Sequence, residues 1–159
     1  MSTEAMVMRG LTLTAEDGPT LRALLAVFAN AFEDQDAYLR RPPSDEYLKD
    51  LLSGASFIAI AGYSGESVVG GLAGYELRKF EQERSEIYIY DLAVLEEYRR
   101  RGVATAMIET LKEVAAKRGA YVIYVQADYG DQAAIALYTK LGTREDVMHF
   151  DIPPSPSAA

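Results

Sequence analysis

Apolar positions along the chain follow two periods, which separate the expected helices from the expected strands. A helical period begins near Pro19 and runs for about four turns. Its apolar face is Leu21, Leu24, Leu25, Phe28 and Phe32. A shorter helical pattern follows, with Ser44 as its N-cap and Gly54 at its end. Its expected buried stripe is Tyr47, Leu48, Leu51 and Leu52.

Stretches rich in β-branched and aromatic residues predict the strands of the first half. A short alternating pattern over residues 9–14 predicts the first strand. Residues 56–61 and 67–77 flank a turn and predict a hairpin, whose glycines indicate bends or close backbone approach. Residues 87–94 predict the next strand. Because short links join these strands, we expect an antiparallel meander.

The second half of the chain predicts a strand–helix–strand unit. A helical period runs from Gly102 to Arg118, and residues 121–125 then predict a buried strand. This strand should lie parallel to residues 87–94, because a helical crossover joins the two. A short helix ending at Gly142 and a last strand over residues 146–152 follow.

These elements predict one domain of the α/β (α+β) class over residues 1–152, followed by a disordered tail over residues 153–159. Its mixed sheet should combine the antiparallel meander with the parallel βαβ unit and carry helices on both faces. The chain has 159 residues, 49% of them hydrophobic, which suits one core and is too short for two ordinary domains.

Charge and composition narrow the chemistry. The chain carries 16 basic and 24 acidic residues, a net charge of −8, which argues against nucleic acid as a partner and leaves cationic substrates open. Cysteine is absent and His149 is the single histidine, so we expect no disulfide, cysteine nucleophile or metal site. No apolar run approaches membrane-spanning length, so no membrane partner and a cytoplasmic location are expected.

A basic loop between a predicted strand and a predicted helix is the most distinctive motif. It reads Arg99-Arg100-Arg101-Gly102-Val103-Ala104. The first amides of a helix lack intrahelical partners and carry partial positive charge, and a glycine lets an anion approach the backbone. This layout predicts a binding site for pyrophosphate. The alternative is a basic helix entry on a solvated face.

An acidic segment follows the first predicted helix. Glu33, Asp34 and Asp36 place three carboxylates within four residues. Such a run is either a solvated loop or one wall of a site for a cation, and both interpretations stay open here.

The basic loop, written Arg99-x-x-Gly102-x-Ala104, resembles the Gln/Arg-x-x-Gly-x-Gly/Ala signature of the GCN5-related N-acetyltransferases, the GNAT superfamily. The segment from Asp131 to Gly142 resembles that superfamily's Asn-x-x-Ala-x-x-x-Tyr-x-x-x-Gly motif, with Asp131 where many members have asparagine. The order of predicted elements matches the superfamily fold over nearly the whole chain. The resemblance implies a GNAT fold and acetyl-coenzyme A (acetyl-CoA) as the donor.

Three longer stretches, residues 87–94, 119–131 and 147–152, resemble the type I aminoglycoside 3-N-acetyltransferases. The resemblance implies acetylation of the 3-amino group of a polycationic aminoglycoside by direct transfer through a tetrahedral intermediate, antibiotic resistance by inactivation, and a homodimer. Two alternatives stay open. One is an acetyltransferase for another amine, such as a polyamine, an amino-sugar metabolite or a protein N-terminus. The other is a non-catalytic acyl-CoA sensing module.

The resemblance also implies roles for single residues. Tyr138 matches the tyrosine that acts as general acid near the coenzyme sulfur; its alternative role is core packing. Asp91 is our candidate base, because a carboxylate in an apolar strand is costly unless it is used or paired. It should lie where the central strand separates from its neighbour, and its alternative role is a hydrogen bond at the strand end. The alternative proton acceptors are Asp128, Asp151 and a water held by Tyr88 or Tyr90.

Binding residues follow from the same resemblance and from charge. The expected coenzyme contacts are Leu92, Ala93, Val94, Arg99, Arg100, Arg101, Gly102, Val103, Ala104, Thr105, Asp131 and Ala134. The expected contacts to the cationic substrate are Glu33, Asp34, Asp36, Tyr90, Asp128 and Asp151.

Overall fold

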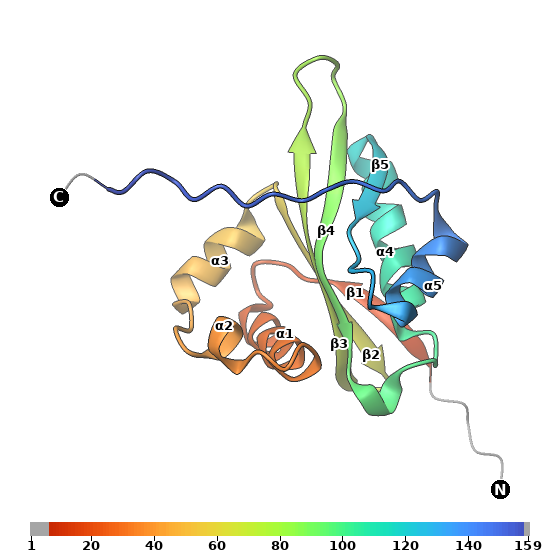
Figure 1. The fold of residues 1–159 in the computed structure, drawn as a ribbon. Helices are drawn as coiled ribbons and strands as arrows, with labels where there is room; N and C mark the ends of the chain where they lie inside the picture. Colours follow the sequence, from red (N-terminus) through yellow and green to blue (C-terminus); the bar gives the residue numbers. More distant parts are fainter. Residues whose placement is uncertain (1–6, 158–159) are drawn as a thin grey trace, which may run out of the picture. The chain divides into compact units, whose positions relative to one another are not determined.

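The computed structural model describes residues 7–157 of the chain. The chain divides into two compact units, Met1–Gln126 and Ala127–Ala159. Figure 1 shows the course of the chain through its helices and strands. Residues 158–159 of the predicted tail lie outside the described residues.

The first unit is built on a five-stranded sheet in the order β1-β2-β3-β4-β5. The strands are β1 (Met8–Thr12), β2 (Phe57–Ser64), β3 (Ser67–Arg78), β4 (Ser85–Val94) and β5 (Ala120–Val125). Neighbours from β1 to β4 are antiparallel, whereas β4 and β5 are parallel. This confirms the predicted mixed sheet with a meander and one βαβ unit.

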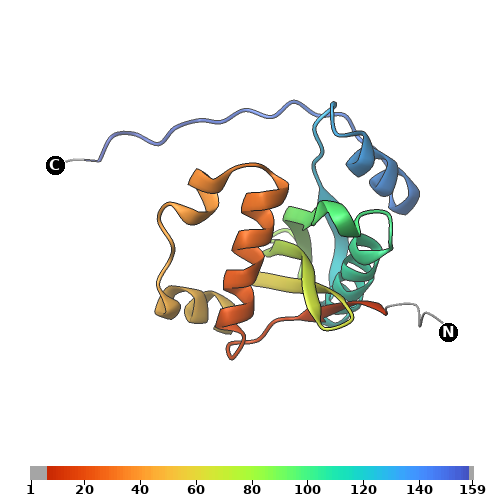
Figure 2. The same ribbon diagram turned by 90° about the horizontal axis from the view of Figure 1, so that it is seen from below.

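Helices cover both faces of this sheet (Figure 2). The helices α1 (Gly18–Ala31), α2 (Gln35–Leu39) and α3 (Asp45–Ser53) lie on one side, and α4 (Val103–Arg118) lies on the other. A short 3₁₀ helix, η1 (Glu96–Tyr98), joins β4 to the loop before α4. The sequence analysis missed α2, since five residues are too few to show a helical period.

Small residues let the helices approach the sheet closely. On the first face, Leu24 and Phe28 of α1 pack in one cluster with alanines of β2. A Cβ added at Gly71 would lie 3.1 Å from the side chains of both Leu24 and Phe28. On the second face, a Cβ at Gly62 would lie 2.8 Å from Val103 of α4. The predicted close approach at the glycines is therefore confirmed.

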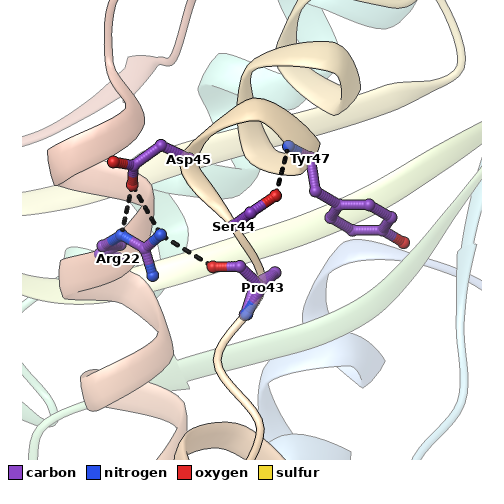
Figure 3. A network of polar contacts seen from close by, with 5 residues as sticks. All are labelled: Arg22, Pro43, Ser44, Asp45 and Tyr47. Atoms are coloured by element: carbon purple, nitrogen blue, oxygen red, sulfur yellow. Dashed lines mark hydrogen bonds and ion pairs between the residues drawn. The ribbon is translucent and has the colours of Figure 1, made fainter.

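A polar network joins α1 to the beginning of α3 (Figure 3). Arg22 donates from its Nε and one terminal nitrogen to Asp45 Oδ1, at 3.0 and 2.6 Å, and to the Pro43 carbonyl at 2.8 Å. The Ser44 hydroxyl accepts from the Tyr47 amide at 3.1 Å, which confirms the predicted N-cap. Because the Asp45 side chain is 93% exposed, the ion pair contributes little stability and mainly fixes the position of α3.

Two expectations about burial are wrong. Tyr47 is 58% exposed, because α3 turns Leu48 toward the core and leaves Tyr47 outside. The strand β5 contains no buried residue, although its sequence is strongly apolar. Among residues 7–157 it is the last strand of the sheet, and β4 is its one neighbouring strand there.

The second unit contains one helix, α5 (Gln132–Leu141), among its described residues. Gly142 ends this helix, as predicted. The predicted strand over residues 146–152 is wrong, because residues 143–157 form neither helix nor strand. The alternation of apolar residues is present, but Met148 and Phe150 are 82% and 74% exposed and no neighbouring strand pairs with them in the described residues.

Candidate active site

The strand β4 changes its pairing within its own length. Its last pair with β5 joins Ile89 to Val125, and beyond that point β4 is paired with β3 alone in the described residues. The pairing with β3 shifts at the same place, so Tyr90 is an extra residue, a β-bulge. Asp91 follows directly on this separation, at the place where the sequence analysis expected it.

A glycine makes this bulge possible. A Cβ added at Gly74 of β3 would lie 2.8 Å from the Tyr88 carbonyl oxygen. That oxygen belongs to the backbone and cannot move aside without distorting the sheet. Any other residue at position 74 would therefore disturb the bulge next to Asp91.

Asp91 lies in a partly buried, hydroxyl-rich environment. The Tyr38 hydroxyl of α2 donates to Asp91 Oδ1 at 3.0 Å. Burial raises the pKa of the Asp91 carboxyl, and the hydrogen bond from Tyr38 offsets part of that rise. A carboxylate with a raised pKa is well matched to accepting a proton near neutral pH.

Tyrosine rings surround this carboxylate on the sheet. Tyr88 stacks on Tyr124 with ring centroids 4.7 Å apart, and its hydroxyl donates to Gln126 Oε1 at 3.0 Å. Tyr90 meets Tyr88 and Tyr75 edge to face, at 5.7 and 6.2 Å. Tyr90 is 64% exposed, so its ring and hydroxyl are accessible to a polar ligand.

The acidic segment lies next to the same carboxylate. Glu33, Asp34 and Asp36 are exposed and lie at the turn and the first residues of α2. Asp34 Oδ1 accepts from the Ala37 amide at 3.0 Å and so serves as the N-cap of α2. Since Tyr38 of this helix contacts Asp91, the fold brings the acidic segment and the candidate base together.

The basic loop has a backbone suited to an anion. Arg100 and Gly102 have φ of 62° and 87°, in the left-handed region, and Gly102 is the N-cap of α4. No side chain caps the first amides of this helix, and alternating right- and left-handed residues form anion-binding concavities. Arg99 Nε donates to the Val94 carbonyl at 3.1 Å, which ties the loop to β4. These residues fit a pyrophosphate group.

Five predicted site residues lie in the second unit: Asp128, Asp131, Ala134, Tyr138 and Asp151. Asp131 Oδ1 accepts from the Ala134 amide at 3.1 Å and caps α5, so the structure shows a structural contact for both residues. Burial, and secondarily the charge of Asp131, raises the pKa of Tyr138 to about 12, which keeps its hydroxyl protonated. Asp151 is exposed and lies 2.8 Å from His149 Nε2. The backbone carbonyl of Asp128 accepts from the Asp131 amide.

Tyr38 and Tyr75 are site neighbours that the sequence analysis did not assign. Tyr38 stands 53 positions before Asp91 in the chain, so no local pattern relates the two. The one feature of the sequence that points to Tyr38 is its position directly after the acidic segment. Tyr75 is paired with Tyr88 across the sheet, a register that the sequence does not reveal.

No group of three or more His, Cys, Asp or Glu side chains within residues 7–157 is placed to hold a metal ion. No helix in the same range is long and apolar enough to cross a membrane.

Residues 21–143 match the Acetyltransferase (GNAT) family, and the chain therefore belongs to that family. A solved structure of an aminoglycoside acetyltransferase (HMB0005) from an uncultured soil metagenomic sample is 54% identical, with a TM-score of 0.91, over 94% of this chain and all of that chain. A second soil metagenomic aminoglycoside acetyltransferase, meta-AAC0020 in complex with sisomicin, is 27% identical, with a TM-score of 0.85, over 93% of this chain and 97% of that chain.

Relatives with other acceptors also match. An N-alpha-acetyltransferase from Saccharolobus solfataricus is 32% identical over 111 residues, 63% of this chain and 62% of that protein. The [ribosomal protein bS18]-alanine N-acetyltransferase of Escherichia coli is 35% identical over 60 residues, 38% of this chain and 40% of that protein. The matched part of this chain thus spans less than two thirds of the length of either relative.

Proposed function

We propose that this protein transfers an acetyl group from acetyl-CoA to an amino group of an aminoglycoside antibiotic. The observation that carries the proposal is 54% identity to an aminoglycoside acetyltransferase whose whole chain is covered. Charge supports it as well, because the net charge of −8 and the exposed acidic segment favour a polycationic substrate.

Asp91 is the base in this proposal. An aminoglycoside amine is largely protonated in water and attacks only after losing a proton. The Asp91 carboxylate lies beside the exposed Tyr90 and next to the acidic segment, so it is placed to take that proton directly or through one water. The acidic side chains Glu33 and Asp36 attract the other ammonium groups of the substrate.

Acetyl-CoA, when bound, supplies the acetyl group as a thioester. The basic loop from Arg99 to Thr105 holds the pyrophosphate in this proposal. The backbone of residues 92–94, which has no partner strand on one side within the described part of the chain, holds the pantetheine arm. Tyr138 donates a proton to the leaving thiolate, since its raised pKa keeps the hydroxyl protonated at neutral pH.

The finer assignments rest on the resemblance to the type I aminoglycoside 3-N-acetyltransferases. We propose the 3-amino group as the acceptor, antibiotic resistance as the outcome, and a cytoplasmic homodimer as the working form. We also propose a boundary between the domain and a tail at residue 152.

The test measures thiol release from acetyl-CoA with sisomicin, gentamicin, kanamycin and spermidine as separate acceptors. We expect turnover with sisomicin and gentamicin and no thiol release with spermidine. NMR of the product then locates the acetyl group, and a product acetylated elsewhere than the 3-amino group would overturn that assignment alone. Coenzyme binding without turnover on any amine would instead favour the acyl-CoA sensing module.

N-terminal acetylation of a protein is the second candidate. The observation that favours it is 32% identity over 111 residues to the Saccharolobus solfataricus N-alpha-acetyltransferase. A peptide with a free N-terminal alanine, assayed beside sisomicin, separates the two. A higher kcat/KM on the peptide would replace the aminoglycoside proposal.

A further inference from the structure

The ring of Tyr38 is held by two aromatic contacts at the C-terminal end of α1. The ring packs against Phe28 of α1 and Phe32 at the C-cap of that helix, with centroid distances of 5.8 and 5.9 Å. Phe28 and Phe32 are themselves stacked, 5.9 Å apart. These rings support the side chain whose hydroxyl donates to Asp91.

The hydrogen bond engages one carboxylate oxygen of Asp91. The hydroxyl donates to Oδ1 at 3.0 Å, and this is the hydrogen bond that the Asp91 side chain makes within residues 7–157. A carboxylate anchored through one oxygen loses rotational freedom, and its second oxygen then has a defined direction. That leaves Oδ2 for the acceptor amine or its water.

The other groups around Asp91 do not replace this donor. Besides Tyr38, the titratable groups that interact with Asp91 include Tyr75 on β3 and Tyr88 on β4, and Asp34 and Tyr90 interact with Tyr38 itself. Each is anionic or neutral, so none provides a positive charge that favours the ionised carboxylate. Burial of Tyr38 and the charge of Asp91 raise the pKa of Tyr38, so the hydroxyl keeps its proton and stays a donor.

We propose that Tyr38 is a positioning residue for the transfer reaction: its hydroxyl orients the Asp91 carboxylate and keeps it available as a base. This inference rests on the proposed function. It also gives α2 a part in the chemistry, because the helix that carries the acidic segment contacts the base through its own tyrosine.

The test compares Tyr38→Phe with Tyr63→Phe. Phenylalanine keeps the ring that packs on α1, so the fold should survive. Tyr63 lies on β2 under the guanidinium of Arg9 and is a matched control, because its substitution also removes one tyrosine hydroxyl. The readouts are kcat and KM against pH with sisomicin and acetyl-CoA, in the full chain.

Losing a hydrogen bond that stabilises the ionised form raises the pKa of the base. The acid limb of kcat should therefore move to higher pH by about one unit in Tyr38→Phe, with kcat below the limb about tenfold lower. The KM for acetyl-CoA should not change, and Tyr63→Phe should match the wild type. The substrate amine also titrates, and its own effect on the dependence of kcat on pH should be the same for every variant.

A double-mutant cycle with Asp91→Asn isolates the coupling. Adding Tyr38→Phe to Asp91→Asn should cause little further loss, because the base is already gone. An equal loss in both backgrounds would overturn the inference, since Tyr38 would then act elsewhere. So would a carbon-13 NMR titration in which the Asp91 carboxyl has the same pKa in Tyr38→Phe and in Tyr63→Phe.

The outcomes separate the two proposals. A wild type that acetylates sisomicin, with Tyr38→Phe indistinguishable from Tyr63→Phe in kcat and pH limb, overturns the role of Tyr38 and leaves the function standing. A wild type that acetylates no aminoglycoside overturns the proposed function, and the positioning role falls with it.

Discussion

Gly102 and Gly119 begin and end the same helix, and together they allow a controlled test of the basic loop. Both have left-handed backbones, with φ of 87° and 73°, and a Cβ added at either would meet nothing within 4 Å. Substituting alanine therefore introduces no collision at either position. The cost is conformational alone, about 1–2 kcal/mol for a non-glycine residue in the left-handed region.

Gly102→Ala and Gly119→Ala should thus lower the free energy of unfolding by similar amounts. For a domain of this size the midpoint temperature should fall by about 2–4 °C per kcal/mol. Coenzyme A affinity should separate them, because only Gly102 precedes the amides assigned to the pyrophosphate. Disturbing one or two charge-assisted hydrogen bonds should weaken binding about 10- to 100-fold in Gly102→Ala and leave Gly119→Ala near the wild type.

Chemical denaturation measures the first quantity, and isothermal titration with coenzyme A measures the second. Equal coenzyme A affinity of the two variants would contradict the assignment of the pyrophosphate to the basic loop. An alanine variant as stable as the wild type would contradict the conformational cost at that glycine. Gly102→Asn gives an internal check, because asparagine tolerates left-handed backbone better than alanine and should be less destabilising.

Three further substitutions test other parts of the site. Tyr138→Phe should lower kcat with little change in coenzyme A affinity, and an unchanged kcat in the thiol-release assay would remove it as the acid. Asp91→Asn should lose activity yet gain stability at neutral pH. Burial raises the pKa of Asp91 in the folded state above its value in the unfolded chain. The protonated carboxyl therefore adds to the free energy of unfolding at low pH, and this contribution is lost as pH rises through the folded-state pKa. Denaturation curves at pH 4 and pH 7 should therefore show the advantage of the variant shrinking as pH falls, and a constant difference would contradict this. Gly74→Ala should destabilise the fold by more than Gly18→Ala in thermal melts, because its Cβ would lie 2.8 Å from the Tyr88 carbonyl oxygen whereas a Cβ at Gly18 meets nothing within 4 Å.

The parts of the fold that could be predicted are helices and strands with a clear period of apolar residues in their own sequence. The helix over Val103–Arg118 and the meander of β2, β3 and β4 carry strong periodic patterns, and they were predicted to within a few residues. The strand predicted over residues 146–152 has the same kind of pattern but is absent, because a strand also needs a partner. Five-residue α2 was missed because it is shorter than two helical turns.

Some residues of the candidate site could likewise be found from the sequence, and others could not. The basic loop is contiguous in sequence, so its residues were found together. Asp91 was selected because a carboxylate in an apolar strand is conspicuous. Its partner Tyr38 was not assigned, because the contact joins a helix to a strand 53 positions away and depends on how α1 and α2 pack on the sheet.

The extra residue in β4 decides which side of the sheet Asp91 faces. Tyr88 is paired with Tyr75 and Asp91 with Ala73, so an even-numbered and an odd-numbered position project from the same side, toward α1 and α2. If Tyr90 were instead paired in a regular ladder, Asp91 would continue the parity of Ile87 and Ile89 on the opposite side, where α4 packs. Deleting Tyr90 would instead close the bulge, so that Asp91 follows Ile89 directly, keeps Ala73 as its partner and stays on the side of α1 and α2. The bulge can therefore absorb the loss of one codon at position 90 without turning the carboxylate to the other face of the sheet.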